Sequence, residues 1–175
     1  AHPDDEALAT GGTMALMAEA GHRVILVVAT RGEEGEPVEG VLETGEKLED
    51  RRSSEVEKSA EILGAARIEF LGYRDSGMVE SDTTSHPNCF WQASKEEAVN
   101  RLSKLLSSEE VDLIVVYDPN GGYGHPDHIQ VLCLLKKSSS IISTSFNTYM
   151  ILTSKSCRIK KTCTTNSHYL SELYL

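Results

Sequence analysis

Two short clusters of histidine and aspartate constrain the fold of this chain more than any other feature, because they stand far apart in the sequence. The first is Ala1–Glu6 (AHPDDE) and the second is Gly124–His128 (GHPDH). Each offers imidazole and carboxylate groups, the donors from which a catalytic zinc takes three protein ligands while a fourth position stays open for water. We interpret the pair as one hydrolytic metal site, which requires a fold that brings both segments together.

The first cluster has the spacing of a metal site at the entry to a helix. His2 and Asp5 stand three residues apart and reach one point from a helical turn, and Pro3 suits the first turn of a helix. Asp4 points in another direction, which leaves one carboxylate for the metal and one for a water molecule. The alternative is a helix N-cap with an acidic first turn, and these residues alone favour neither interpretation.

The second cluster shifts the balance. His125 and His128 bracket Asp127 and follow a glycine-rich loop, residues 118–124, which lets the backbone approach a ligand closely. A single histidine is more often a surface or core residue than a ligand. Two clusters that each offer a ligand and a spare proton-transfer group favour the metal site.

Helical and strand patterns alternate along the chain. Apolar spacing predicts helices over 6–20, 43–63, 96–106 and 127–137, and continuous apolar runs predict strands over 24–29, 67–71 and 111–117, with another near 147–152. This alternation indicates an α/β architecture with a mostly parallel sheet. The loops with candidate functional residues follow the carboxyl ends of predicted strands, the edge where open α/β sheets bind ligands. The polar segment 79–93, which contains Pro87, is expected to be a loop over the site.

Charge and cysteine content narrow the class of partner. The chain has 175 residues, enough for one domain with a core. Its net charge of -10 argues against nucleic acid and anionic membranes as partners. No apolar run approaches the ~20 residues of a membrane span, and no signal peptide opens the chain. Four cysteines without CxxC spacing predict free thiols in a reducing cytoplasm.

Three residues outside the clusters are further candidates. Arg52 falls in line with the apolar stripe of helix 43–63, so it needs a partner or ligand, unless it extends to solvent at the edge of the stripe. Asp75 follows a predicted strand and suits sugar hydroxyls, or else serves as a turn residue. His86 has no partner at ligand spacing, so we do not expect it to bind metal.

Five stretches resemble the LmbE/PIG-L family of zinc-dependent N-acetylglucosamine de-N-acetylases, and they occur in the family's order. The two His/Asp motifs are specific to the family, whereas the fourth and fifth stretches point to its branch in mycothiol metabolism. The stretches are AHPDDE at 1–6, ATRGEEGE at 29–36, RSSEVEKSAEILG at 52–64, GYRDSGM at 72–78 and YDPNGGYGHPDH at 117–128.

The resemblance implies roles for residues of this chain. It places zinc on His2, Asp5 and His128, although ferrous iron accepts the same donors, and it makes Asp4 the general base. The other implied roles are His125 at the oxyanion or the leaving amine, oriented by Asp127, with Tyr123 beside the substrate carbonyl, and Arg52, Asp75 and Met78 at the substrate.

The resemblance also implies a fold and its boundaries. The family has a Rossmann-like three-layer fold in which the AHPDD motif ends the first, central strand. We therefore expect a catalytic domain over 1–137 that lacks this strand before Ala1. Residues 138–175, rich in Ser, Thr and Lys, are expected to form a divergent C-terminal segment with one strand.

The implied reaction is hydrolysis of the N-acetyl group of an N-acetylglucosaminyl conjugate, such as an N-acetylglucosaminyl-inositol, with release of acetate. The expected partner is thus a small amino-sugar conjugate. Two alternatives stay open: an amidase that acts on a mycothiol S-conjugate-like substrate, and a non-catalytic fragment of the family.

Overall fold

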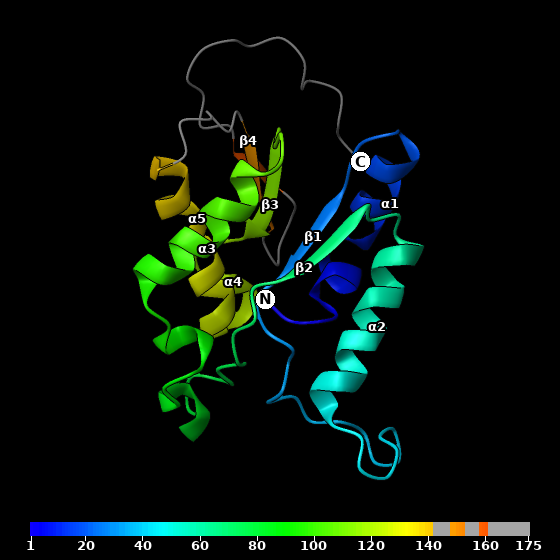
Figure 1. Ribbon diagram of the computed structural model, residues 1–175, viewed down its shortest axis with the longest axis vertical. Coiled ribbons are helices and arrows are strands. Elements are labelled where there is room, and N and C mark those ends of the chain that lie inside the picture. The colour runs from blue at the N-terminus through cyan, green and yellow to red at the C-terminus, as the bar shows by residue number, and fades with distance from the viewer. Residues whose placement is uncertain (142–147, 153–157, 161–175) are drawn as a thin grey trace.

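Helices and strands alternate in the structure, a computed structural model that describes residues 1–141, 148–152 and 158–160 (Figure 1). In chain order the elements are η1 (Glu6–Thr10), α1 (Gly11–Glu19), β1 (Ile25–Val28), α2 (Leu48–Ile62), β2 (Arg67–Phe70), η2 (Asp82–Ser85), η3 (Phe90–Gln92), α3 (Lys95–Ser107), β3 (Leu113–Tyr117), α4 (Gly121–Gly124), α5 (Pro126–Ile141), β4 (Thr148–Leu152) and β5 (Arg158–Lys160).

The strands form two sheets in which most pairs are parallel. β1 and β2 pair in parallel, with Ile25 opposite Arg67. β3 and β4 also pair in parallel, with Leu113 opposite Thr148, and β5 adds to β4 in the antiparallel direction. The predicted α/β fold with an open, mostly parallel sheet is therefore confirmed. None of the helices in the described part of the chain is both long and apolar enough to cross a membrane.

β1 and β3 face each other without pairing. They belong to separate sheets in the described part of the chain, and a cavity of about 410 Å³ lies between them, lined by both strands and by apolar residues of α1, α3 and α5. The central strand that the family has before its first motif, and that we expected this chain to lack, is not among the described elements. Ala1 lies beside the carboxyl end of β1, where its carbonyl accepts the main-chain N–H of Thr30 at 3.0 Å.

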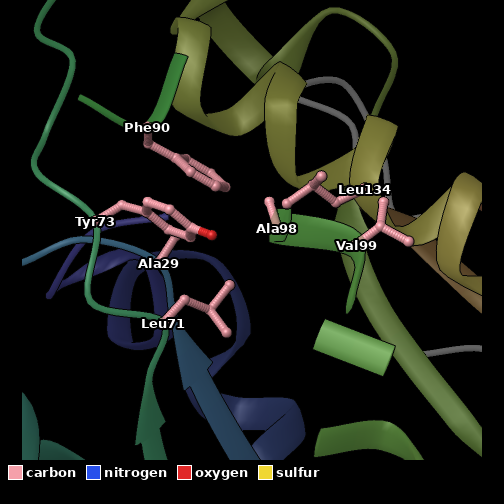
Figure 2. Close-up of a cluster of buried hydrophobic side chains, with 7 residues drawn as sticks. All are labelled: Ala29, Leu71, Tyr73, Phe90, Ala98, Val99 and Leu134. Atoms are coloured by element: carbon pink, nitrogen blue, oxygen red, sulfur yellow. The ribbon is translucent and has the colours of Figure 1, made fainter. Parts of the chain in front are cut away.

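A buried hydrophobic cluster ties the strand ends to the helices (Figure 2). It consists of Ala29, Leu71, Tyr73, Phe90, Ala98, Val99 and Leu134. Phe90 is fully buried, and its ring stacks on Tyr73 with the centroids 4.9 Å apart. Because these residues come from the segments after β1 and β2, from η3, and from α3 and α5, their packing fixes the loops at the carboxyl ends of the strands.

Element bounds differ from the predicted ones where local backbone chemistry opposes the apolar pattern. The predicted helix over 43–63 begins only at Leu48, because Gly45 adopts a φ of 83° that a continuous helix does not allow. The segment 79–93, expected to be a loop, contains the short helical turns η2 and η3.

The helix after the first cluster starts with a wide turn. η1 is a π-helical turn that leads directly into α1, and the carbonyl of Asp4 accepts the main-chain N–H groups of Ala7 and Leu8, each at 3.0 Å. Turns of this kind occur frequently at functional sites. The turn begins at Glu6, immediately after the candidate ligands.

Candidate metal centre

The two histidine and aspartate clusters meet in the structure. The N-terminus lies next to α4 and the start of α5, although these segments are far apart in the sequence (Figure 1). His2 Nδ1 lies 3.3 Å from His128 Nε2, and Asp5 Oδ2 lies 3.5 Å from His2 Nδ1 and 3.4 Å from His128 Nε2. Two ligands about 2.0–2.1 Å from a tetrahedral zinc are separated by about 3.3–3.4 Å. The three atoms therefore have the spacing of three corners of such a site.

Hydrogen bonds on the far side of each ring fix the tautomers of the two histidines. His128 Nδ1 donates to the carbonyl of Gly121 at 3.0 Å, and His2 Nε2 donates to Asp127 Oδ2 at 3.1 Å. With those hydrogens placed, the neutral rings direct two lone pairs at each other and at the Asp5 carboxylate. His2 Nδ1, His128 Nε2 and Asp5 Oδ2 are then three acceptor atoms that repel one another unless a cation or a proton lies between them. This donor set therefore fits a metal ion. Metal-bound histidines commonly have outer partners of this kind.

Gly121 allows the backbone to approach His128 closely. Its φ is 63°, and an added Cβ would lie 2.9 Å from the Cβ of His128. A larger residue would displace the imidazole and the carbonyl that orients it. Within the glycine-rich loop, the backbone thus approaches the side chain of His128 closely at Gly121, the first residue of α4.

Asp127 is held by the loop that follows β2. This carboxylate is fully buried and accepts hydrogen bonds from the main-chain N–H of Ser76 at 3.0 Å and from the Ser76 hydroxyl. The resemblance implied that Asp127 orients His125, but in the structure the carboxylate contacts His2. His125 instead receives the main-chain N–H of Asp127 on its Nδ1 at 3.2 Å.

Carboxylates surround His2 and favour a positive charge there. Burial alone would lower the pKa of His2, but hydrogen bonds with Asp127, Asp5 and Asp75 raise it to about 10. Burial opposes ionisation of Asp5, yet its contacts with His128 and His2 hold its pKa well below the usual range. Burial and the positive charge of His2 lower the pKa of His125 to about 4. The carboxylates therefore favour positive charge at His2, which either a proton on its ring or a bound metal ion can supply.

Asp4 does not turn towards the ligand cluster. It is the single residue other than glycine with a positive φ in the described part of the chain, at 116°, and its carboxylate forms an ion pair with Arg52 at 2.9 Å. Burial raises the pKa of Asp4, and the nearby guanidinium opposes that change. This contact gives Arg52 a protein partner, which its position on an apolar stripe required.

The other predicted site residues lie around the same centre. Asp75 is buried with its Oδ1 3.4 Å from His2 Nε2, and the same oxygen accepts the main-chain N–H of Gly77 at 2.9 Å, so its carboxylate serves the turn and also faces the candidate site. Tyr123 is exposed, and its ring centroid lies 5.1 Å from that of His128 and 6.0 Å from that of His125. Met78 is half-exposed, and its carbonyl accepts the main-chain N–H of Ser81 and the Thr84 hydroxyl, each at 2.8 Å.

Two residues at the centre were not predicted. Tyr117 donates its hydroxyl to Asp5 Oδ2 at 2.7 Å and stacks on His128 with the ring centroids 4.1 Å apart. Ser76 holds Asp127, as described above. Tyr117 ends an apolar strand directly before the second cluster, so its position was a usable signal, whereas nothing in the sequence around Ser76 indicated its partner.

Comparisons with known proteins identify the family of the chain. The family model described as PIG-L, GlcNAc-PI de-N-acetylase, matches residues 1–137. A 1D-myo-inositol 2-acetamido-2-deoxy-alpha-D-glucopyranoside deacetylase from Thermobifida fusca is 46% identical over 141 residues, which is 74% of this chain and 49% of that protein. A protein of the same name from Thermomonospora curvata is 44% identical over 139 residues, 74% of this chain and 47% of that protein. The chain thus spans about half the length of the curated relatives that it matches.

A solved structure supports the same fold assignment. N,N'-diacetylchitobiose deacetylase from Pyrococcus horikoshii superposes with a TM-score of 0.68 at 27% identity, over 86% of this chain and 57% of that one. The match extends past the motifs to most of the described fold. With the family model covering the chain from its first cluster through most of α5, this chain belongs to the PIG-L family of GlcNAc-PI de-N-acetylases.

Proposed function

We propose that this chain binds zinc through His2 Nδ1, Asp5 Oδ2 and His128 Nε2 and hydrolyses the N-acetyl group of an N-acetylglucosaminyl conjugate. The observation that carries the metal site is the convergence of three acceptor atoms at 3.3–3.5 Å. The substrate class is supported by relatives named as deacetylases of an N-acetylglucosaminyl-inositol. We assign the activity to residues 1–137, the part that the family model matches.

Zinc, when bound, lowers the pKa of its water towards about 7 and polarises the amide carbonyl. Ferrous iron is the alternative, because the same imidazole and carboxylate donors accept it. In the reaction, water adds to the acetyl carbonyl and the C–N bond breaks, so that the products are acetate and a free amino sugar.

Asp4 is proposed as the general base that takes the proton of the attacking water. Its carboxylate is next in sequence to the ligand Asp5 but is bound to a guanidinium instead of the ligand cluster. It therefore keeps a role separate from metal binding. Removal of a general base typically costs 10²–10⁴-fold in rate.

His125 is proposed to stabilise the oxyanion with an N–H group. Its Nδ1 accepts a main-chain N–H, so in the neutral ring the hydrogen is on Nε2, which makes this atom a donor. Of the two roles implied for His125, a neutral N–H donor favours oxyanion stabilisation. Tyr123 lies at the rim beside His125, where its hydroxyl is proposed to contact the substrate carbonyl.

Asp75 and Met78 are proposed to face the sugar. Asp75 already accepts the main-chain N–H of Gly77 and of Glu34, which fixes its carboxylate beside His2. Met78 follows it in the same loop with half of its side chain exposed. Asp75 is thus placed to accept a hydrogen bond from a sugar hydroxyl, and Met78 to make an apolar contact with the sugar at the entrance of the site.

The test combines metal content with product release from protein purified without chelator. We expect one metal ion per chain, and acetate release from N-acetylglucosaminyl-inositol that a chelator abolishes. Asp4→Asn is expected to keep the metal and lower turnover by ~10² or more, while Asp112→Asn, the same change at the exposed opposite end of β3, leaves both unchanged.

Other outcomes of the same assay identify the alternatives. Faster cleavage of the amide of a thioether conjugate than of the N-acetyl group would favour the amidase. Stoichiometric metal without hydrolysis of either amide would indicate a binding fragment. Failure to bind metal in a folded sample would mean that His2, Asp5 and His128 do not form the site.

A further inference from the structure

We propose that Tyr117 is a positioning residue of the metal site, and that its side chain sets the relative position of one ligand from each histidine and aspartate cluster. This role rests on the proposed function, in which Asp5 and His128 bind the metal. Tyr117 contacts the first through its hydroxyl and the second through its ring. It is not among the residues to which the family resemblance gave a role.

The hydroxyl of Tyr117 holds the carboxylate of Asp5. Tyr117 is the last residue of β3, and its hydroxyl donates to Asp5 Oδ2 at 2.7 Å. The Ala1 nitrogen donates to the same phenol oxygen at 2.6 Å, so the one hydrogen of the phenol remains for Asp5. The main-chain N–H of His2 also donates to Asp5 Oδ2, at 2.9 Å. Two donors from distant segments thus hold the oxygen that we assign to the metal.

The ring of Tyr117 holds the plane of His128. The two rings stack with their centroids 4.1 Å apart and their planes 17° apart. The hydrogen bond between His128 Nδ1 and the Gly121 carbonyl directs the imidazole along one line, but the ring can still rotate about that line. A parallel ring against its face opposes this rotation. Together the two contacts direct the lone pair on His128 Nε2 to one point.

Tyr117 therefore joins the two clusters where their ligands meet. Asp5 belongs to the first cluster and His128 to the second, and Asp5 Oδ2 lies 3.4 Å from His128 Nε2. Because the hydroxyl and the ring belong to one rigid side chain, this separation cannot change far without loss of a contact. Hydrogen-bonded partners behind metal ligands typically contribute 10–100-fold in metal affinity. We assign a contribution of this kind to Tyr117.

The simpler alternative is that Tyr117 only packs the end of β3. A packing residue stabilises the metal-free and the metal-loaded protein equally, so its loss lowers both melting temperatures alike. A positioning residue stabilises the metal-loaded protein more, so its loss reduces the rise in melting temperature that zinc produces. This difference can be measured without turnover.

Tyr117→Phe isolates the hydrogen bond, because phenylalanine keeps the ring that stacks on His128. In the full chain we expect this variant to bind zinc about tenfold more weakly in competition with a chromophoric chelator. The rise in melting temperature on addition of zinc should shrink with it. Tyr117→Leu removes the ring as well, so we expect a further loss of affinity of up to about tenfold, the scale of one aromatic pair.

Tyr73 provides a matched control. Its hydroxyl also donates to a carboxylate, that of Glu97, and its ring also stacks on another ring, that of Phe90. Neither partner is a candidate metal ligand. Tyr73→Phe therefore removes the same kind of contact away from the site, and it is expected to leave zinc affinity and the zinc-induced rise in melting temperature unchanged.

The outcomes separate the role of Tyr117 from the existence of the metal site. His128→Ala is expected to abolish zinc binding. If it does, wild-type zinc affinity in Tyr117→Phe would overturn the role of Tyr117 and leave the site in place. Equal losses of affinity in Tyr117→Phe and Tyr73→Phe would also overturn it, because they would reflect general destabilisation. A folded wild-type chain that binds no zinc would overturn both the role and the proposed site.

Discussion

Asp127→Asn tests the outer contact that orients His2, the proposed metal ligand. The wild-type carboxylate lies 3.1 Å from His2 Nε2, is fully buried and receives two hydrogen bonds from Ser76. Asparagine keeps the shape of the side chain: its oxygen can still accept from His2 and from the Ser76 N–H, while its amide group faces the Ser76 hydroxyl. The variant therefore removes a charge and keeps most contacts.

The magnitude follows from the loss of charge assistance. A buried hydrogen bond to a charged group contributes about 1.5–3 kcal/mol, and a charge-assisted bond is about twice as strong as a neutral one. Losing about half, ~0.8–1.5 kcal/mol, weakens zinc binding by about 4- to 13-fold. Outer partners of metal-bound histidines typically contribute 10–100-fold in affinity, so we expect about a tenfold loss.

The assay is competition for zinc between the protein and a chromophoric chelator at constant, near-neutral pH. Asp112→Asn is the matched control, since that residue is exposed at the amino end of β3. Thermal melting of each variant establishes that the fold is intact. Wild-type affinity in Asp127→Asn, combined with loss of binding in His2→Ala, would refute the orienting role of Asp127.

Three further predictions concern stability. Phe90→Ala removes a fully buried ring that stacks on a tyrosine and should lower the free energy of unfolding in urea by about 3–5 kcal/mol. Ser103→Ala removes a buried hydroxyl that has no hydrogen-bond partner among the residues that the structure describes and replaces serine with a better helix former. The free energy of unfolding in urea should therefore rise by about 0.5–1 kcal/mol. Hydrogen bonds from Arg23 and Arg67 lower the pKa of Glu109 from its ordinary 4.5 to about 2. The stability that these bonds supply is therefore present above pH 4.5 and is lost as the pH falls towards 2. Melting temperatures of Glu109→Gln should therefore lack that part of the wild-type decline, and parallel curves for both proteins would contradict the assignment.

Apolar periodicity was sufficient to predict the order and type of most elements. β1, β3, α3 and α5 all occur where apolar runs and helical stripes were found. These signals are local, so they need no knowledge of the partner. The predicted start of α2 was wrong because Gly45 has a positive φ that a helix does not allow, although the surrounding sequence is compatible with a helix.

The ligand spacing of the candidate site was also readable, but its outer contacts were not. His2 and Asp5 do converge, but not through the expected helical turn, because Asp4 has a φ of 116° and the helical segment begins only at Glu6. The partner of the Asp127 carboxylate depends instead on where the loop after β2 lies, and Ser76 is 51 residues away in the sequence. No local pattern encodes such a contact; the family resemblance implied that Asp127 orients His125, whereas its carboxylate contacts His2.

The charge balance around His2 links the fold to metal binding. Asp5, Asp75 and Asp127 all lie within 3.5 Å of its ring nitrogens, and burial of several carboxylates destabilises a fold unless positive charge balances them. The divalent cation that we propose between His2, Asp5 and His128 would supply positive charge in the folded state alone, and its binding free energy would then add to the stability of the fold. A proton on His2, whose pKa these carboxylates raise to about 10, balances part of the same charge. The cation and the proton therefore compete for one ring.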